Sequence, residues 1–232
     1  MDTLKTIARI RTDYPDKFGI PRQSGLVPEA RGRIVFEPEY RDANALRGLE
    51  GFSHIWILWG FSLIPESGWQ PMVKPPKLGG NTRMGVFATR SPFRPNPIGL
   101  SCVRLDEIRS VPGEGSVLIV SGADLADGTP IYDIKPYLPF TDSHPDASGG
   151  FADAHADERI PVEFPEDLLR LVPERLRPAL LGTLSLDPRP AYQSDPDLPY
   201  GLRFAGLDIR FHVRDGVLTV FSVVPSGTEP VK

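Results

Sequence analysis

Two arginines and an asparagine lie in a short segment that three prolines stiffen. The segment runs from Ala88 to Gly99 and contains Arg90, Arg94 and Asn96. Because proline fixes a backbone torsion angle, such a loop loses little conformational entropy when its side chains order around a ligand. No Asp or Glu in the segment neutralises the arginines. A stiff loop that only joins two strands is the alternative, but the uncompensated cations favour a site for an anionic group.

A second turn places polar groups directly after a proline. In Pro21-Arg22-Gln23 a cation and an amide follow a fixed backbone position, and they could hold a ligand's carboxylate or heteroatoms. A plain surface turn would have the same sequence. This string therefore indicates a binding site only if the fold brings it beside other polar loops.

A third segment begins with the turn signal Asp127-Gly128 and continues through Thr129-Pro130. The residues after it alternate Asp133, Lys135 and Tyr137, so these side chains are expected on one face of an extended segment. A carboxylate, an ammonium and a phenol could do acid–base work or hold a substrate there. An ion pair on the surface of a sheet is the alternative.

Charge is divided unevenly along the chain. Residues 1–104 hold 15 Lys and Arg against 9 Asp and Glu, whereas residues 105–232 hold 11 against 21. Between Ser67 and Leu105 no acidic residue occurs, and the six cations are Lys74, Lys77, Arg83, Arg90, Arg94 and Arg104. A segment of one sign is expected to contact phosphate or another anion, and a solvated basic face without a partner is the alternative.

The common signatures of nucleotide, metal and hydrolase sites are missing. There is no Gly-x-Gly-x-x-Gly, no phosphate-binding loop with Gly-Lys-Ser/Thr, and no Gly-x-Ser-x-Gly. The four histidines are scattered without zinc-ligand spacing, so no metal is expected. A single cysteine, Cys102, cannot form an internal disulfide, and no leader or membrane span is apparent, which together predict a cytoplasmic protein without a membrane partner.

The apolar pattern predicts a mainly β fold. Only one short helix is expected in the first half of the chain, near Arg41 to Leu46, and 26 prolines with 22 glycines favour loops and short strands. Six strands are predicted at Leu4 to Ile10, Gly32 to Phe36, His54 to Phe61, Met84 to Ala88, Leu100 to Ile108 and Val117 to Ser121. Their number and spacing indicate a closed antiparallel β-barrel or a sandwich.

The character of the sequence changes after the barrel region. We predict a barrel domain over residues 1–140, an acidic loop or linker over 141–158, and a small α+β domain over 159–232. In the last domain, the leucine-rich stretch from Glu166 to Leu184 is interrupted by prolines and predicts one or two short helices. Asp215-Gly216 between two apolar runs predicts a tight hairpin.

Several strings of this sequence, taken together and in order, resemble those of the TsaA-like family, also called TrmO, of tRNA (adenosine(37)-N6)-methyltransferases. The resemblance covers about Leu4 to Phe140, and a further match at Asp187 to Tyr192 extends it. The strings are Pro21-Arg22-Gln23, Arg47-Gly48-Leu49-Glu50-Gly51-Phe52-Ser53-His54, Gly85-Val86-Phe87-Ala88-Thr89-Arg90-Ser91, Arg94-Pro95-Asn96-Pro97-Ile98-Gly99 and Asp127-Gly128-Thr129-Pro130.

The resemblance implies a β-barrel that binds S-adenosylmethionine, works as a homodimer and methylates the exocyclic nitrogen of N6-threonylcarbamoyladenosine at position 37 of tRNA, with threonine tRNA as the expected species. The cofactor contacts that it implies fall on Pro21, Arg22, Gln23, Phe61, Ser62, Arg90, Leu100, Asp127, Gly128, Thr129 and Pro130. Some relatives have histidine where this chain has Ser62, which leaves open what its side chain contributes.

The residue chemistry agrees with such a cofactor, because Phe61 and Leu100 offer apolar surface and the arginines offer polar anchors. We expect substrate contacts from Lys74, Lys77, Arg94, Asn96 and Tyr192. The candidates for catalysis are Asp133, Lys135 and Tyr137, and the sequence does not identify which of them, if any, takes up a proton.

Two alternatives remain at this point. One is a protein that binds S-adenosylmethionine or RNA as a sensor without turnover, because a fold and a pocket do not guarantee catalysis. The other is a methyltransferase that acts on a different RNA base or on a small metabolite.

Overall fold

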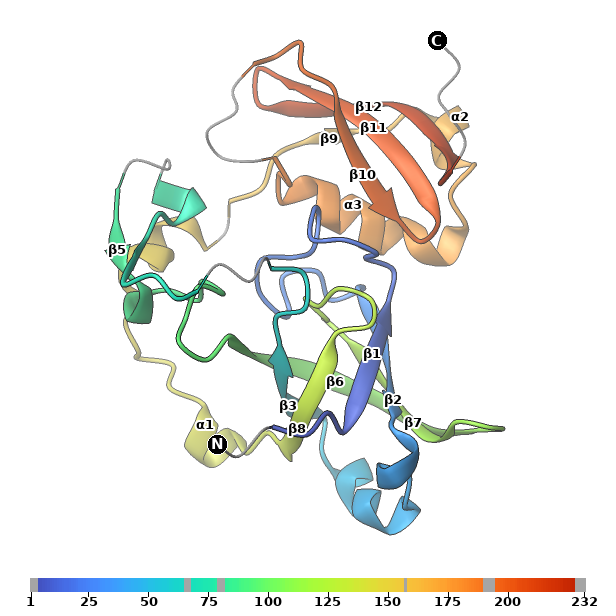
Figure 1. Cartoon of the computed structure of the whole chain (residues 1–232). Coiled ribbons are helices and arrows are strands. Elements are labelled where there is room, and N and C mark those ends of the chain that lie inside the picture. Colours follow the sequence, from blue (N-terminus) through green and yellow to red (C-terminus); the bar gives the residue numbers. More distant parts are fainter. Residues whose placement is uncertain (1–3, 65–67, 79–81, 157, 190–194, 228–232) are drawn as a thin grey trace.

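The computed structural model describes residues 4–64, 68–78, 82–156, 158–189 and 195–227. Six antiparallel strands close into a barrel in the order β1-β2-β7-β6-β3-β8, in the lower half of Figure 1. This confirms the predicted fold class. The barrel strands are β1 (Ala8–Thr12), β2 (Arg31–Phe36), β3 (His54–Gly60), β6 (Ile98–Val111), β7 (Gly115–Ser121) and β8 (Pro130–Pro136).

The barrel interior follows from the alternation of apolar and polar residues. Ile10 pairs with Ile34, and Ile34 pairs with Leu118, so these three side chains form one row across neighbouring strands. All three are fully buried. Burying an aliphatic side chain of this size contributes roughly 1.5–3 kcal/mol, which makes such rows the main source of barrel stability.

The sixth strand of the barrel is not the one that the sequence pattern predicted. Residues 84–88 instead form β5 (Met84–Gly85), which pairs with β4 (Met72–Val73), and the 3₁₀ helix η5 (Val86–Ala88). Phe87 is 74% exposed, so this segment has no regular apolar face to bury in the barrel. The barrel is closed by β8, which pairs with both β1 and β3 and contributes the fully buried Ile131.

The helix predicted near Arg41 to Leu46 is a single 3₁₀ turn, η2 (Ala43–Leu46). The side chain of Asp42 caps it by accepting a hydrogen bond from the Asn44 amide. The other short elements before the C-terminal unit are η1 (Pro38–Tyr40), η3 (Leu49–Gly51), η4 (Pro76–Leu78), α1 (Pro139–Asp142) and η6 (Gly150–His155).

The C-terminal unit is a four-stranded sheet in the order β10-β11-β12-β9, with helices beside it (Figure 1). Asp215 and Gly216 both have positive φ angles, 49° and 77°, as the predicted tight hairpin requires. The leucine-rich stretch forms short helices, as predicted, and Pro173 precedes one of them. Pro178 does not interrupt a helix as expected, because it lies in the first turn of α3, where proline is tolerated. The elements are β9 (Val162–Glu163), α2 (Glu166–Leu169), η7 (Glu174–Leu176), α3 (Arg177–Ser185), β10 (Tyr200–Phe204), β11 (Leu207–Arg214) and β12 (Val217–Pro225).

The connection between β1 and β2 links the two units. Tyr14 and Val27 are almost fully buried in the same apolar cluster as the C-terminal sheet and α3. The Tyr14 hydroxyl lies 2.8 Å from the hydroxyl of Thr183 on α3. In Figure 1 the blue connection accordingly rises from the barrel toward α3. Pro21-Arg22-Gln23 lies in this connection, so packing against the C-terminal unit helps to position it.

Among the described residues, no helix is long and apolar enough to cross a membrane.

Candidate functional site

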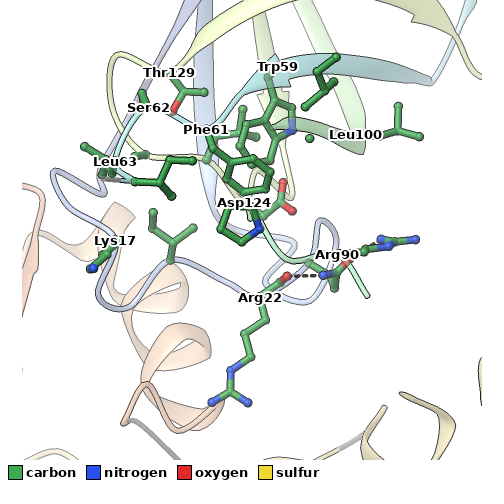
Figure 2. Close-up of a pocket in the computed structure, with 18 of the residues that line it drawn as sticks. Lys17, Arg22, Trp59, Phe61, Ser62, Leu63, Arg90, Leu100, Asp124 and Thr129 are labelled. Carbon is green, nitrogen blue, oxygen red and sulfur yellow. Dashed lines mark hydrogen bonds between the residues drawn. The ribbon is translucent and has the colours of Figure 1, made fainter. Parts of the chain in front are cut away.

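A cavity of about 460 Å³ opens where β3 ends and β6 begins (Figure 2). Four separate segments line it: the β1–β2 connection, the end of β3 with the residues after it, the proline-rich loop before β6, and the loop between β7 and β8. The volume falls in the range of sites for small organic ligands.

Three polar residues that are far apart in the sequence meet at this cavity. Gln23, Arg90 and Thr129 all line it, and the Arg90 guanidinium donates a hydrogen bond to the Gln23 side-chain oxygen. The Ser24 hydroxyl accepts a hydrogen bond of 3.2 Å from the Cys102 amide on β6. These contacts fix the loops relative to the barrel, so the polar groups are arranged before any ligand arrives.

One wall of the cavity is apolar. The rings of Trp59 and Phe61 lie 4.5 Å apart between centroids, at an interplanar angle of 60°. Leu100 also lines the cavity and is 53% exposed, which places it at the edge. Such a wall suits a planar aromatic ligand group.

Gly99 is required for this wall, because a Cβ atom there would overlap the Trp59 indole ring. Gly99→Ala is therefore expected to lower the free energy of unfolding by about 1–3 kcal/mol, the usual cost of overpacking. Thermal unfolding measures the effect. Gly51→Ala is the matched control, since nothing lies within 4 Å of a Cβ atom at that position. Equal melting temperatures for the two variants would contradict the packing.

Asp124, which the sequence reasoning missed, lies in the cavity lining beside the aromatic wall (Figure 2). The Ser101 hydroxyl donates to its Oδ1 atom at 2.6 Å, and Trp59 Nε1 donates to the Ser101 oxygen at 2.9 Å. Burial raises the pKa of Asp124 to about 6, although the hydrogen bond from Ser101 and the charge of Arg90 act against the rise. The cavity therefore contains a carboxylate whose charge is costly to maintain.

The raised pKa of Asp124 makes stability depend on pH. Between the two pKa values of this carboxyl group, about 6 in the folded protein and the ordinary 3.8 in the unfolded chain, mainly the folded protein binds the proton. The free energy of unfolding therefore rises as the pH falls through 6. Relative to Asp124→Asn, the wild type is expected to gain about 1 kcal/mol from about pH 7.5 to about pH 5. Urea unfolding at both pH values measures this difference, and parallel pH dependences would contradict it.

The cavity brings together most of the residues predicted to bind a cofactor: Pro21, Arg22, Gln23, Phe61, Ser62, Arg90, Leu100 and Thr129. The Ser62 hydroxyl lies 3.5 Å from that of Thr129, so this serine extends the polar side of the lining. The lining also contains residues that the sequence reasoning did not select, including Lys17, Leu63, Ile64, Pro92 and Ile98.

Asp127, Gly128 and Pro130 are not part of the lining; the first two help to position Thr129. The Asp127 Oδ1 atom accepts a hydrogen bond of 3.0 Å from the Thr12 amide. Gly128 has a φ angle of 77°, and its amide donates to the Ile10 carbonyl at 2.8 Å. These contacts hold the turn against β1 and direct the buried Thr129 toward the cavity.

The residues predicted to contact substrate are only partly brought to the cavity. Arg94 lines it, and the Nη1 atom donates to the Thr89 carbonyl at 2.6 Å. Lys74 and Asn96 are exposed and are not part of the lining. The side chain of Lys77 and the whole of Tyr192 lie outside the described residues.

The predicted catalytic trio lies on and just after β8, outside the lining. Asp133 and Lys135 form an ion pair of 2.8 Å, which is the alternative that the sequence left open. Leu58 pairs with Asp133 on one side and with Leu100 on the other, so it separates the carboxylate from the cavity edge. The Tyr137 ring packs 5.8 Å from that of Trp56. A catalytic role for these three residues remains a prediction.

Within the described ranges, no group of three or more His, Cys, Asp or Glu side chains could hold a metal ion.

The same loops and barrel occur in a known family. Residues 9–143 match the family described as tRNA-methyltransferase O N-terminal domain, and residues 157–226 match the TrmO C-terminal domain. The chain is 45% identical to the tRNA (adenine(37)-N6)-methyltransferase of Escherichia coli over 94% of its own length and 96% of the relative's. It is 44% identical to a Pseudomonas aeruginosa protein over 90% and 92% of the two chains, and that protein's name contains the words S-adenosylmethionine-dependent methyltransferase.

The fold is likewise similar to a crystal structure of TrmO from Pseudomonas aeruginosa. The TM-score is 0.77 at 36% sequence identity, and the match covers 97% of this chain and 98% of the other. Both halves of the sequence and the whole fold thus match the same family. The chain therefore belongs to the tRNA-methyltransferase O family of enzymes.

Proposed function

We propose that this protein binds S-adenosylmethionine in the cavity and methylates the exocyclic N6 nitrogen of adenosine 37 in tRNA. We further propose that the target base carries a threonylcarbamoyl group and that threonine tRNA is the main substrate. The observation that carries the proposal is the meeting of Gln23, Arg90 and Thr129 at one cavity, in a chain whose relatives are named for this reaction.

The donor set of the cavity fits S-adenosylmethionine. Trp59, Phe61 and Leu100 provide apolar surface for the adenine ring, and Arg90 with Gln23 can hold the carboxylate of the amino-acid end. Asp124 places a negative charge near a cofactor whose sulfonium and ammonium groups are positive. When bound, S-adenosylmethionine supplies an electrophilic methyl carbon.

The residues of the chain contribute mainly by orientation. Because the reaction needs the nucleophile, the methyl carbon and the leaving sulfur in line, a rigid cavity can account for much of the acceleration. The hydrogen bond between Arg90 and Gln23 and the tethered Thr129 turn supply that rigidity.

The cations near the cavity support an RNA substrate. Arg90 and Arg94 line it, and Lys74 and Arg83 are exposed in the same basic stretch. Arginine and lysine contacts to phosphates supply most of the sequence-independent affinity for nucleic acid. A threonylcarbamoyl group would add a carboxylate that one of the cavity arginines can bind.

The test uses labelled S-adenosylmethionine and threonine tRNA with and without the threonylcarbamoyl group. We expect label only in the modified tRNA, and mass spectrometry of the nucleosides should locate the methyl group on N6. Equal labelling of tRNA without the modification would contradict the proposed substrate. Cofactor binding with no label in any tRNA would favour a sensor.

We also propose that the protein acts as a homodimer in the cytoplasm, where its tRNA substrate would be found. Leu58 and Leu100 pair on the outer face of the barrel, and the exposure of Leu100 supports a partner there. Light scattering after size exclusion is expected to give twice the 25.6 kDa of one chain. A mass of one chain at micromolar concentration would contradict the dimer.

A further inference from the structure

Asp124 is the single carboxylate among the described residues that line the cavity. That part of the lining contains no histidine, cysteine or tyrosine, and its other ionisable side chains are Lys17, Arg22, Arg90 and Arg94. In Figure 2 Asp124 lies near the aromatic wall, whereas Lys17 lies at the far left of the view. An arginine cannot give up its proton in a protein, so few groups here can accept one.

A chain of hydrogen bonds fixes this carboxylate. Trp59 Nε1 has only a proton to offer, and it donates to the Ser101 oxygen. The Ser101 hydroxyl is then left to donate its own proton to Asp124 Oδ1. Ser101 is 1% exposed and Trp59 is 9% exposed, so this series of hydrogen bonds is sheltered from solvent.

We propose that Asp124 is the catalytic base that removes the proton from the N6 nitrogen of the target adenosine, and that Ser101 is the residue that positions it. The arrangement of a base held by a second, buried group is the one by which enzymes orient proton acceptors. This inference rests on the proposed function, because it names the base for that methyl transfer.

The step balances without a further reactant. A bond forms between N6 and the methyl carbon, and the bond between that carbon and sulfur breaks with its electron pair left on sulfur. The N6–H bond breaks, its electron pair stays on nitrogen, and the proton passes to the Asp124 carboxylate. The positive charge of the sulfonium is thus replaced by a proton on Asp124, which solvent can later remove.

The electrostatic setting of Asp124 suits this role. Burial raises its pKa to about 6, and Ser101, the amides of Ser24 and Asp124, and the charge of Arg90 from the proline-rich loop all oppose the rise. A base is most effective when its pKa lies near the working pH, because it is then both ionised and basic. The rate is expected to fall as the pH drops through 6, since protonated Asp124 cannot accept a proton.

The decisive variant is Asp124→Asn, which keeps the shape of the side chain but cannot accept the proton. Single-turnover methylation of tRNA at saturating S-adenosylmethionine is expected to slow by about 100- to 10,000-fold, the usual contribution of a positioned base. Calorimetry is expected to show cofactor affinity within about tenfold of wild type, because the substitution removes one Coulomb attraction and leaves Arg90 and Gln23 in place to hold the cofactor. Thermal unfolding establishes that the variant is folded.

Asp106→Asn is the matched control. Asp106 also accepts a hydrogen bond from a serine, Ser121, but it lies outside the cavity. This variant is expected to methylate tRNA at the wild-type rate. Asp133→Asn is measured in the same assay. If Asp133→Asn loses most of its methylation rate while Asp124→Asn keeps the wild-type rate, the base is Asp133 and our assignment is overturned.

Ser101→Ala tests the positioning role through the pH profile. Removing the hydroxyl removes a hydrogen bond that favours the ionised carboxylate, so the acidic limb of the rate profile is expected to move to higher pH. A lower rate with an unmoved limb would overturn the positioning role, because a purely structural defect would not shift the limb.

The outcomes separate this inference from the proposed function. Wild-type protein that methylates no tRNA would overturn both. If the wild type is active and Asp124→Asn is equally active, only the assignment of Asp124 as the catalytic base is overturned. If weaker cofactor binding explains the whole loss of activity of Asp124→Asn, the assignment of Asp124 as the base is also overturned. The residue would then be a cofactor anchor.

Discussion

Arg90→Ala is expected to weaken the binding of S-adenosylmethionine by about 10- to 100-fold. Arg90 lines the cavity, is held by Gln23 and is the arginine whose charge acts on Asp124. A hydrogen bond to a charged group contributes about 1.5–3 kcal/mol, which corresponds to this loss. Calorimetry with S-adenosylmethionine measures it directly, without tRNA.

Arg104→Ala is the control for Arg90→Ala, because Arg104 belongs to the same basic stretch but is paired with Asp106 and lies outside the cavity. It is expected to bind the cofactor like the wild type. Wild-type affinity of Arg90→Ala would remove that residue from the site. Equal weakening by both variants would show that net charge, rather than a specific contact, governs cofactor binding.

Reversing two exposed cations is expected to lower tRNA affinity by at least about tenfold at low salt, because each lost phosphate contact also forfeits counterion release. The variant carries Lys74→Glu and Arg83→Glu, both outside the cavity. The plot of log affinity against log salt is expected to lose roughly 0.7–0.9 in slope for each lost contact. Filter binding over a range of salt concentrations measures both quantities.

The matched control for this pair is Arg33→Glu with Arg109→Glu, which changes the net charge equally. Arg33 lies on β2, and Arg109 lies toward the end of β6 that is farther from the cavity. These substitutions are expected to weaken tRNA binding much less, and neither pair should change cofactor affinity. Equal losses from the two pairs would indicate a general charge effect and would contradict an RNA surface beside the cavity.

The sequence pattern allowed the barrel to be predicted, and the resemblance to a known family pointed to many of the residues that line the cavity. Rows of alternating residues such as Ile10 and Ile34 identify strands, because a period of two is the direct signature of a half-buried sheet. The Asp215-Gly216 hairpin was equally clear, since few sequences favour two positive φ angles. The prolines of the loops at Pro21 and Arg90 marked rigid turns, and these turns do line the cavity.

The remaining parts depend on contacts between distant residues. Asp124 lies three residues after β7, next to a glycine turn, where an acidic residue usually faces solvent. Its hydrogen-bond partner Ser101, and Trp59, which donates to Ser101, lie on other strands. The one local sign was its place between the fully buried Ala123 and Leu125. The division of the chain at 141–158 remains a prediction.

A similar reason explains the strand that was assigned wrongly. Residues 84–88 and 130–136 are both short and partly apolar, and periodicity cannot distinguish them. β8, and not residues 84–88, closes the barrel, because Ile131 of β8 is buried in the interior between β1 and β3. Phe87 remains outside, beneath the Arg94 guanidinium, which lies 5.7 Å from the ring centroid.

A structure of the protein with S-adenosylmethionine shows whether the cavity is the cofactor site. We expect the cofactor in the cavity, with Gln23, Arg90 and Thr129 within hydrogen-bond or van der Waals contact and its methyl group open to a target base beside Asp124. Cofactor bound at another surface, with these residues apart from it, would show that the cavity is not the cofactor site.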